Sequence, residues 1–266
     1  MRFSFLFYEP IPTLAELDRR MGILASLGYQ GVELSAFHPS SYSAEEIAGL
    51  TQKHRLPVVS FLTGWSYPNE KLCLSSPDPL VRGRAVCRLN DYVGDAATLS
   101  ALIVVGLMQG LRSDEPDLSI ANGRIVEGLR RVARTAQDRG ISIVLEPVNH
   151  LQVGFNHNAA EVAALVDRIG SPAMSYMLDT FHLNIEEHSI LEAIRAHGPR
   201  IRHCHLCETN GGAFGTGHLD FRSVLSALDQ AGYSRFVSVK VYRVPDWEEA
   251  ARSTVEFLRA AGVWVS

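Results

Sequence analysis

The stretch SIVLEPVNHLQVGFNHNAAEVAALVDRIGSPAMSYML (142–178) contains one complete strand–helix–strand unit. Its apolar run at 142–146 has the length and composition of a buried strand, and a second such run occupies 175–178. Between them, apolar residues recur with helical spacing over 159–169, directly after Asn158, a residue type that caps helix N-termini. The stretch therefore predicts two strands joined by a helix.

The same alternation continues along the whole chain. The predicted strands lie at 3–8, 31–34, 57–62, 101–107, 142–146, 175–178, 202–206 and 236–241. The predicted helices lie at 14–27, 44–54, 80–98, 120–139, 159–169, 190–197, 221–231 and 247–260. Gly28 and Gly140 follow helices and Ser43 stands at an N-cap, as helix ends favour.

Eight such units fix the expected fold class. A (β/α)8 barrel needs eight strand–helix units in roughly 250 residues, whereas a doubly wound open sheet has about five or six strands. We therefore expect an α/β fold, with a single TIM barrel domain spanning residues 1–266. Two long irregular stretches, 63–78 and 209–220, are candidate active-site loops.

Composition excludes several kinds of partner. Lys and Arg number 25 against 29 Asp and Glu, which gives a formal charge of −4. This balance offers no basic surface for nucleic acid or an anionic membrane, and no apolar run is long enough to cross a bilayer. The four cysteines are too few and too irregularly spaced for a disulfide scaffold, which favours a cytoplasmic protein. Cys204 and Cys207 form a C-x-x-C, but side chains three apart on a strand diverge, which disfavours redox or zinc chemistry.

Ligand-type side chains cluster at the ends of three consecutive predicted strands. The fifth strand ends at Glu146, the sixth is followed by Asp179 and His182, and the seventh ends with His205 and Glu208. In a TIM barrel the carboxyl ends of the strands meet at one face, where reactive side chains stand. Two carboxylates and an imidazole there are suitable ligands for Mg²⁺, Mn²⁺, Co²⁺ or Zn²⁺.

Four segments resemble a known family. They are LEPVN (145–149), MLDTFHLNIEE (177–187), HCHLCETN (203–210) and GTGHLDF (215–221). They are similar to the xylose isomerase-like TIM barrels grouped as sugar phosphate isomerases and epimerases, especially the ketose 3-epimerases. The resemblance covers essentially the whole chain and is strongest from residue 141 onward.

The resemblance implies a metal-dependent enzyme. In that family one divalent ion is held by Glu, Asp, His and a second Glu, and the two glutamates move a proton on the substrate. The matching metal ligands here are Glu146, Asp179 and His205, and His182 matches a histidine that contacts the substrate. A metal ion in such a site polarises the carbonyl while carboxylates transfer the proton.

Three positions depart from the family pattern. Lys240 stands where the second glutamate is expected, Gln152 replaces a glutamate six residues after Glu146, and Gly211 replaces an arginine after the H-x-x-E element. We therefore expect a divergent branch that acts on a different oxidised or keto sugar.

Lys240 allows three interpretations. An ammonium about 4 Å from a dication would meet about 8 kcal/mol of repulsion at an effective dielectric near 20, before ligand carboxylates offset it. In the favoured interpretation, a bound metal pushes Lys240 toward its neutral form, and it acts as a base opposite Glu146. In the second, its ammonium partly replaces the metal by pairing with Glu146 and Asp179. A Schiff base with a keto sugar is the third.

Further residues are candidates for the substrate pocket. Trp65, with Phe7 or Tyr8, could form an apolar wall for a sugar ring, although packing at the barrel rim explains them equally well. Glu33, at the end of the second strand, either lines the pocket or is a buried ion-pair partner.

Three polar residues near the strand ends are expected to bind substrate. His150 and Gln152 follow Glu146 on its loop and are placed to hydrogen-bond hydroxyl groups, and Glu208 follows the seventh strand. The expected partner is thus a small sugar, with no nucleic acid and no membrane, and assembly into a homo-oligomer is left open.

Three functions compete. The first is an isomerase, epimerase or related lyase that moves a proton next to the carbonyl of a keto sugar or sugar derivative, with one divalent ion. The second is a non-catalytic or metal-free sugar-binding member of the same family, in which Lys240 marks the loss of metal chemistry. The third, an abasic-site endonuclease, lacks the histidines for a three-zinc cluster at its early strand ends and the basic face that DNA binding needs.

Overall fold

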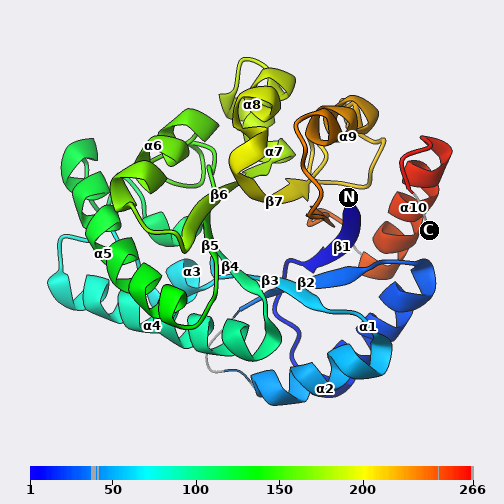
Figure 1. Cartoon of the computed structure of the whole chain (residues 1–266), viewed down its shortest axis with the longest axis horizontal. Helices are drawn as coiled ribbons and strands as arrows, with labels where there is room; N and C mark the ends of the chain where they lie inside the picture. Colours follow the sequence, from blue (N-terminus) through cyan, green and yellow to red (C-terminus); the bar gives the residue numbers. More distant parts are fainter. Residues whose placement is uncertain (37–39, 41, 245, 265–266) are drawn as a thin grey trace.

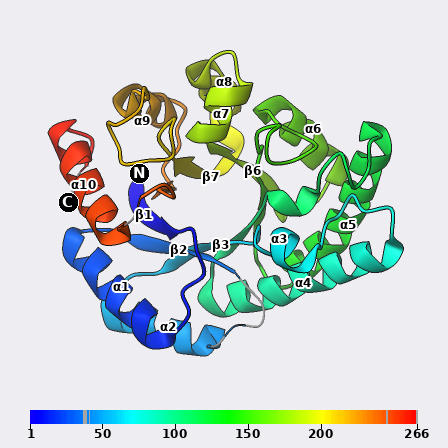
Figure 2. The same cartoon turned by 180° about the vertical axis from the view of Figure 1, so that it is seen from behind.

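The computed structural model describes residues 1–36, 40, 42–244 and 246–264. Within these residues, eight parallel strands follow one another in chain order and close into a barrel, and helices surround it in both views (Figures 1 and 2). The strands are β1 (Arg2–Phe7), β2 (Gly31–Ser35), β3 (Val58–Leu62), β4 (Leu102–Val105), β5 (Ile143–Leu145), β6 (Met174–Asp179), β7 (Ile201–Leu206) and β8 (Phe236–Val239). The predicted (β/α)8 TIM barrel is confirmed.

The outer layer contains each of the predicted helices. They are α1 (Leu14–Leu27), α2 (Ala44–His54), α4 (Pro79–Leu99), α5 (Leu118–Asp138), α6 (Ala159–Ile169), α8 (Ile190–His197), α9 (Phe221–Gln230) and α10 (Trp247–Ala260). Two further short helices, α3 (Ser66–Glu70) and α7 (Thr180–Glu186), lie at the carboxyl ends of β3 and β6. The prediction of a single helix after every strand was therefore wrong at these two places.

Local residue choice explains where the helices begin and end. Ser43 and Glu46 form a capping box at the start of α2, and the Asn158 side chain accepts from the Glu161 N–H at the start of α6. Gly28 ends α1 with φ = 92°, a conformation that glycine adopts without steric cost. Both predicted N-caps are confirmed.

The parallel register places the functional side chains at one level. Asp179 on β6 pairs with His205 on β7, and His205 pairs in turn with Ser238 on β8. Short runs such as β5 and β8 end one residue before Glu146 and Lys240, so both side chains emerge at the same face of the barrel. Parallel pairing therefore gathers residues that lie far apart in the sequence.

The barrel interior has an apolar part and a polar part. Leu6, Leu62, Val104, Val144 and Met177 form an apolar cluster inside the barrel. The polar part consists of buried side chains from β1, β2, β3, β7 and β8: Ser4, Glu33, Ser60, His203, His205 and Ser238. Buried polar groups require partners, so this part of the interior must be a hydrogen-bonded network.

The described residues contain no helix that combines the length and the apolar character needed to cross a bilayer.

Cys204 and Cys207 are both buried, and each carries a free thiol. Burial raises the pKa of both thiols, which disfavours the reactive thiolate form.

Candidate active site

A pocket opens at the carboxyl end of the barrel. Its cavity of about 240 Å³ is lined by Tyr8, Leu62, Gly64, Trp65, Pro68, Gly106, Leu107, Glu146, Val148, Gln152, His182 and Lys240. The aromatic and aliphatic members form its walls, whereas Glu146, His182 and Lys240 supply charged and polar groups. A small polar molecule with one less polar face fits such a lining.

Two buried carboxylates form the acidic side of the site. Asp179 ends β6, and its Oδ1 accepts a hydrogen bond of 2.8 Å from the Phe181 N–H, which caps α7. Glu146 follows β5, and the Gln109 side chain donates to its backbone carbonyl at 3.1 Å. Strand and helix ends therefore hold both carboxylates in place.

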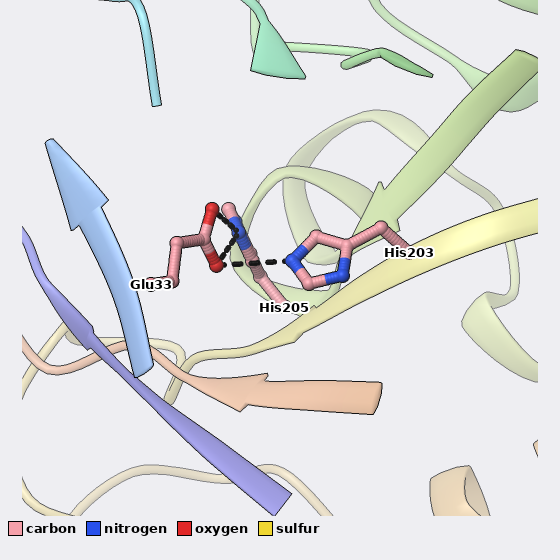
Figure 3. A group of neighbouring side chains, drawn as sticks. All are labelled: Glu33, His203 and His205. Carbon is pink, nitrogen blue, oxygen red and sulfur yellow. Dashed lines mark hydrogen bonds and ion pairs between the residues drawn. The ribbon is translucent and has the colours of Figure 1, made fainter. Parts of the chain in front are cut away.

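His205 lies between these carboxylates and Glu33. Its Nδ1 is 3.3 Å from Asp179 Oδ2 and 3.4 Å from Glu146 Oε1. Its Nε2 is 3.1 and 3.0 Å from the two oxygens of Glu33 (Figure 3). Burial lowers the pKa of His205, but the surrounding carboxylates, Glu33 first, raise it well above its usual value. An Nδ1 lone pair facing two carboxylates would be repelled, so this position requires either a proton or a metal cation.

His182 presents a hydrogen-bond donor to the same carboxylates. The Asn149 side-chain amide lies 2.7 Å from its Nδ1, and the Asn149 Oδ1 already accepts from the Leu151 N–H. The amide nitrogen therefore donates to Nδ1, which leaves the proton on Nε2. Nε2 is 3.8 Å from both Glu146 Oε1 and Asp179 Oδ2. Burial lowers the pKa of His182, which favours this neutral donor form.

Lys240 directly follows β8 and lies on the remaining side of the site. Its Nζ lies 2.6 Å from Asp179 Oδ2 and 4.0 Å from Glu146 Oε1. Burial lowers the pKa of Lys240, but Asp179 and Glu146 outweigh burial and raise it. The direct ion pair with Asp179 favours the ammonium among the described residues, whereas the neutral lysine that the sequence favoured depends on a bound metal ion and stays a prediction.

The charge states of the carboxylates follow from the same contacts. Burial raises the pKa of Asp179, but Lys240 and His182 lower it to well below its usual range. Burial also raises the pKa of Glu146, but the nearby Lys240 ammonium outweighs burial and lowers this pKa below its usual value. Both groups are therefore ionised at neutral pH.

The donor set fits a divalent metal ion. Ligand atoms of Glu146, Asp179 and His182 lie within 4.8 Å of one another, and His205 Nδ1 adjoins the same two carboxylates. Glu146 Oε1 is buried and has no hydrogen-bond partner among the described residues, so it has a coordination position to offer. Because the proton on His182 occupies Nε2, His205 is the better third ligand.

Trp65 and Gln152 are pocket residues, as the sequence suggested. Trp65 lines the wall, and its indole N–H donates to the Tyr8 carbonyl at 2.8 Å. Tyr8 is a second wall residue, its ring centroid lying 6.2 Å from that of Trp65. Gln152 is exposed at the rim of the pocket, where it can reach a substrate from the solvent side.

His150 and Glu208 do not point into the pocket. His150 is exposed, and its Nδ1 pairs with Glu186 at 2.6 Å. Glu208 is fully buried and accepts hydrogen bonds from the N–H groups of Thr209, Gly215 and Leu219. Instead of facing a substrate, its carboxylate organises the loop over 209–220, because that loop folds back over it.

The glycine at position 211 is explained by a neighbouring ring. Gly211 has φ = 71°, and a Cβ there would lie 2.6 Å from the Tyr242 ring. Tyr242 in turn packs against Tyr8 at a centroid distance of 5.4 Å and against Phe181 at 5.7 Å. An aromatic cluster thus adjoins the place where the family pattern has an arginine.

Three polar residues of the site, His203, Asn149 and Gln109, were not predicted from the sequence. His203 contacts Glu33, and Asn149 contacts His182. The Gln109 side chain donates to the backbone carbonyl of Glu146. The spacing of His203 and His205 was a usable signal, because residues two apart on a strand face the same side of the sheet. No comparable pattern marks Asn149 or Gln109, whose partners lie 33 and 37 residues away.

Comparison with known proteins identifies similar chains. A family pattern described as a xylose isomerase-like TIM barrel matches residues 22–261. A D-psicose 3-epimerase of Agrobacterium fabrum is 30% identical over 223 residues, which cover 82% of this chain and 77% of that protein. An L-ribulose 3-epimerase of Mesorhizobium japonicum is 29% identical over 231 residues, covering 86% and 76%.

A solved structure agrees with these sequence matches. A D-psicose 3-epimerase crystallised in the presence of D-fructose superposes with a TM-score of 0.85 at 25% identity, covering 99% of this chain and 100% of that one. The structural similarity therefore extends over the whole barrel, including the strand ends that carry the pocket.

Proposed function

We propose that this chain, which belongs to the xylose isomerase-like TIM barrel family, is a sugar isomerase or epimerase. The proposed reaction moves a proton next to the carbonyl of a keto sugar or sugar derivative. The observation that carries the proposal is the position of Glu146. Its ionised carboxylate lines the pocket 4.0 Å from the Lys240 ammonium and 3.8 Å from His182 Nε2. A base thus stands beside two hydrogen-bond donors, which enolisation requires.

One divalent ion, held by Glu146, Asp179 and His205, is part of the proposal. When bound, such an ion supplies Lewis-acid polarisation of the substrate carbonyl. Glu146 Oε1, which accepts no hydrogen bond within the described part of the chain, and the two carboxylates around His205 Nδ1 support this ligand set. Two carboxylates and an imidazole are suitable ligands for Mn²⁺, Mg²⁺, Co²⁺ or Zn²⁺.

The proton transfer follows from the side chains. Glu146 takes a proton from the carbon next to the carbonyl, and the C–H electron pair moves into an enediolate. The Nε2–H of His182 donates to the oxygen on which negative charge develops. Lys240 then delivers a proton to the opposite face of the same carbon, which inverts it. Once the product has left, Glu146 and Lys240 are again 4.0 Å apart, and the proton on Glu146 returns to the lysine amine.

The pocket walls supply orientation. Tyr8 and Trp65 present ring faces on which the less polar side of a sugar stacks, and Gln152 at the rim is placed for a hydroxyl group. With Lys240, Gln152 and Gly211 in place of the family residues, we propose a different keto or oxidised sugar from those named for the relatives.

The test is a screen of keto sugars in D₂O with Mn²⁺-loaded protein. D-psicose, L-ribulose and 3-keto glycosides are incubated separately, and NMR follows deuterium incorporation and product configuration. Solvent deuterium at the carbon next to the carbonyl, in a Glu146-dependent reaction, supports the proposal. Elimination of water with the same Glu146 dependence would assign a lyase instead.

The Lys240–Asp179 ion pair favours one second candidate, a metal-free sugar-binding protein. There the ammonium stands in for the cation, and the pocket binds a sugar without turning it over. Metal analysis of the purified protein separates the candidates, since sugar binding without any metal uptake or deuterium exchange would establish the binder.

A further inference from the structure

Glu33, His203 and His205 form a buried network beneath the pocket. Glu33 comes from β2 and the two histidines from β7, and Figure 3 shows both imidazole rings facing one carboxylate. His203 Nε2 lies 2.9 Å from Glu33 Oε2, and all three side chains are at most 2% exposed. None of the three lines the pocket, so the network acts on a substrate only through other residues.

The carboxylate fixes the tautomer of His205. The two oxygens of Glu33 lie 3.1 and 3.0 Å from His205 Nε2, and Glu33 Oε2 lies 2.9 Å from His203 Nε2. A carboxylate placed against two imidazole nitrogens accepts from both, so both Nε2 atoms carry the proton and donate. With its proton on Nε2, a neutral His205 has its lone pair on Nδ1, which faces Asp179 and Glu146 at 3.3 and 3.4 Å.

The charges around the pocket favour the same arrangement. Glu33, Glu146 and Asp179 are three buried carboxylates, and Lys240 provides one positive charge beside them. A dication together with this ammonium balances three carboxylates, whereas two carboxylates would leave one positive charge in excess. The negative charge of Glu33 therefore attracts a divalent ion and offsets part of the repulsion that the ion meets from Lys240.

We infer that Glu33 is a positioning residue for the metal site: its hydrogen bond to His205 Nε2 aims Nδ1 at the cation position between Glu146 and Asp179. The inference rests on the proposed metal-dependent function. A carboxylate that accepts a hydrogen bond from the second ring nitrogen of a metal-ligating histidine orients the ring and raises its basicity. His203 is the second donor to Glu33 and holds the carboxylate in place.

The first experiment measures Mn²⁺ binding by calorimetry after removal of metal with EDTA. Glu33→Gln should weaken Mn²⁺ binding by about 10- to 100-fold, and Glu33→Asp, which keeps the charge, should recover part of that loss. Glu115→Gln is the matched control, because Glu115 is also a buried, paired carboxylate but lies outside the pocket lining. Urea unfolding of each variant separates loss of metal affinity from loss of fold.

A second measurement uses the unmodified protein. In Zn²⁺-loaded protein labelled with ¹⁵N, the imidazole spectrum should show His205 with its proton on Nε2 and its metal on Nδ1. Mn²⁺ binding to Glu33→Gln as tight as to the wild type, or a proton on Nδ1 of His205 in the loaded protein, would overturn the inference alone. Absence of Mn²⁺ binding by the wild type would overturn the proposed metal site and this inference with it.

Discussion

The ammonium of Lys240 lies 2.6 Å from Oδ2 of Asp179; Asp179 ends β6 and Lys240 directly follows β8, the strands on either side of β7. This contact sets the chemistry available at the mouth of the barrel. A lysine held this way is a hydrogen-bond and proton donor, whereas the family pattern has a carboxylate at the same place. The site therefore offers one carboxylate and one ammonium for proton transfer.

Lys240→Met removes the proposed proton donor while keeping a side chain of similar length. We expect kcat for deuterium exchange to fall by at least about 10²-fold. Mn²⁺ affinity should not fall, because the repulsion between the ammonium and the metal disappears. Exchange kinetics by NMR and Mn²⁺ calorimetry on the same sample check both parts. Near-normal turnover would reduce Lys240 to a structural cation.

The activity should show no rise with pH that depends on Lys240. Its pKa is raised above the ordinary value of 10.5, so the ammonium is present below that pH and is lost only as the pH climbs through the higher folded value. Between about pH 7 and 10, kcat should therefore lack an increasing lysine-dependent limb. A rise seen in the wild type but absent from Lys240→Met would instead identify a neutral lysine acting as a base.

Asp179→Asn tests the metal site without removing the helix cap. Asparagine retains Oδ1, which accepts from the Phe181 N–H, but it loses the charge beside His205 and Lys240. We expect Mn²⁺ binding to weaken by at least about tenfold, with the circular dichroism spectrum unchanged. Unaltered Mn²⁺ affinity would show that the ion, if bound, lies elsewhere.

Gly106→Ala should displace the carboxylate of Glu146, the proposed base. A Cβ at Gly106 would lie 2.5 Å from Glu146 Oε2, and the flexible end of Glu146 would have to move. The fold should survive, but kcat should fall by about 10- to 100-fold, because small misplacements of a reacting group are costly. The control is Gly123→Ala, on α5, where a Cβ meets nothing within 4 Å. Equal kinetics in both variants would contradict this view of Glu146.

Glu208→Ala should loosen the loop over 209–220. Three backbone N–H groups lose a charged acceptor, and hydrogen bonds to charged groups are worth about 1.5–3 kcal/mol each. Hydrogen exchange of Gly215 and Leu219 should accelerate, while His218→Ala, an exposed change on the same loop, should leave it unaltered. Exchange that is equally slow in both variants would mean that other contacts hold the loop.

The loops after β3 and β7 were both expected to act as active-site loops, and they differ in kind. The first contains α3 and carries Trp65 to the pocket wall, whereas the second is organised around Glu208. Whether either becomes more ordered on ligand binding stays a prediction, which hydrogen exchange with a saturating ligand can test.

The sequence by itself determined the barrel and the acidic side of the site. Eight repeats of strand and helix periodicity specify the elements, and parallel strands end at one face, so Glu146, Asp179 and His205 had to converge. The short helices α3 and α7, of 5 and 7 residues, escaped prediction because they are too short to show a helical period.

Only the tertiary structure decided how the charged groups pair. Glu33 and His203 are 170 residues apart, and Asp179 and Lys240 are 61 apart, so no local pattern encodes either contact. Whether Lys240 is neutral or charged, and which nitrogen of His205 faces the pocket, depends on distances of about 3 Å between side chains on different strands. Periodicity fixes the face of the sheet to which a residue points, but pKa and tautomer depend on the neighbours that the closed barrel brings into contact.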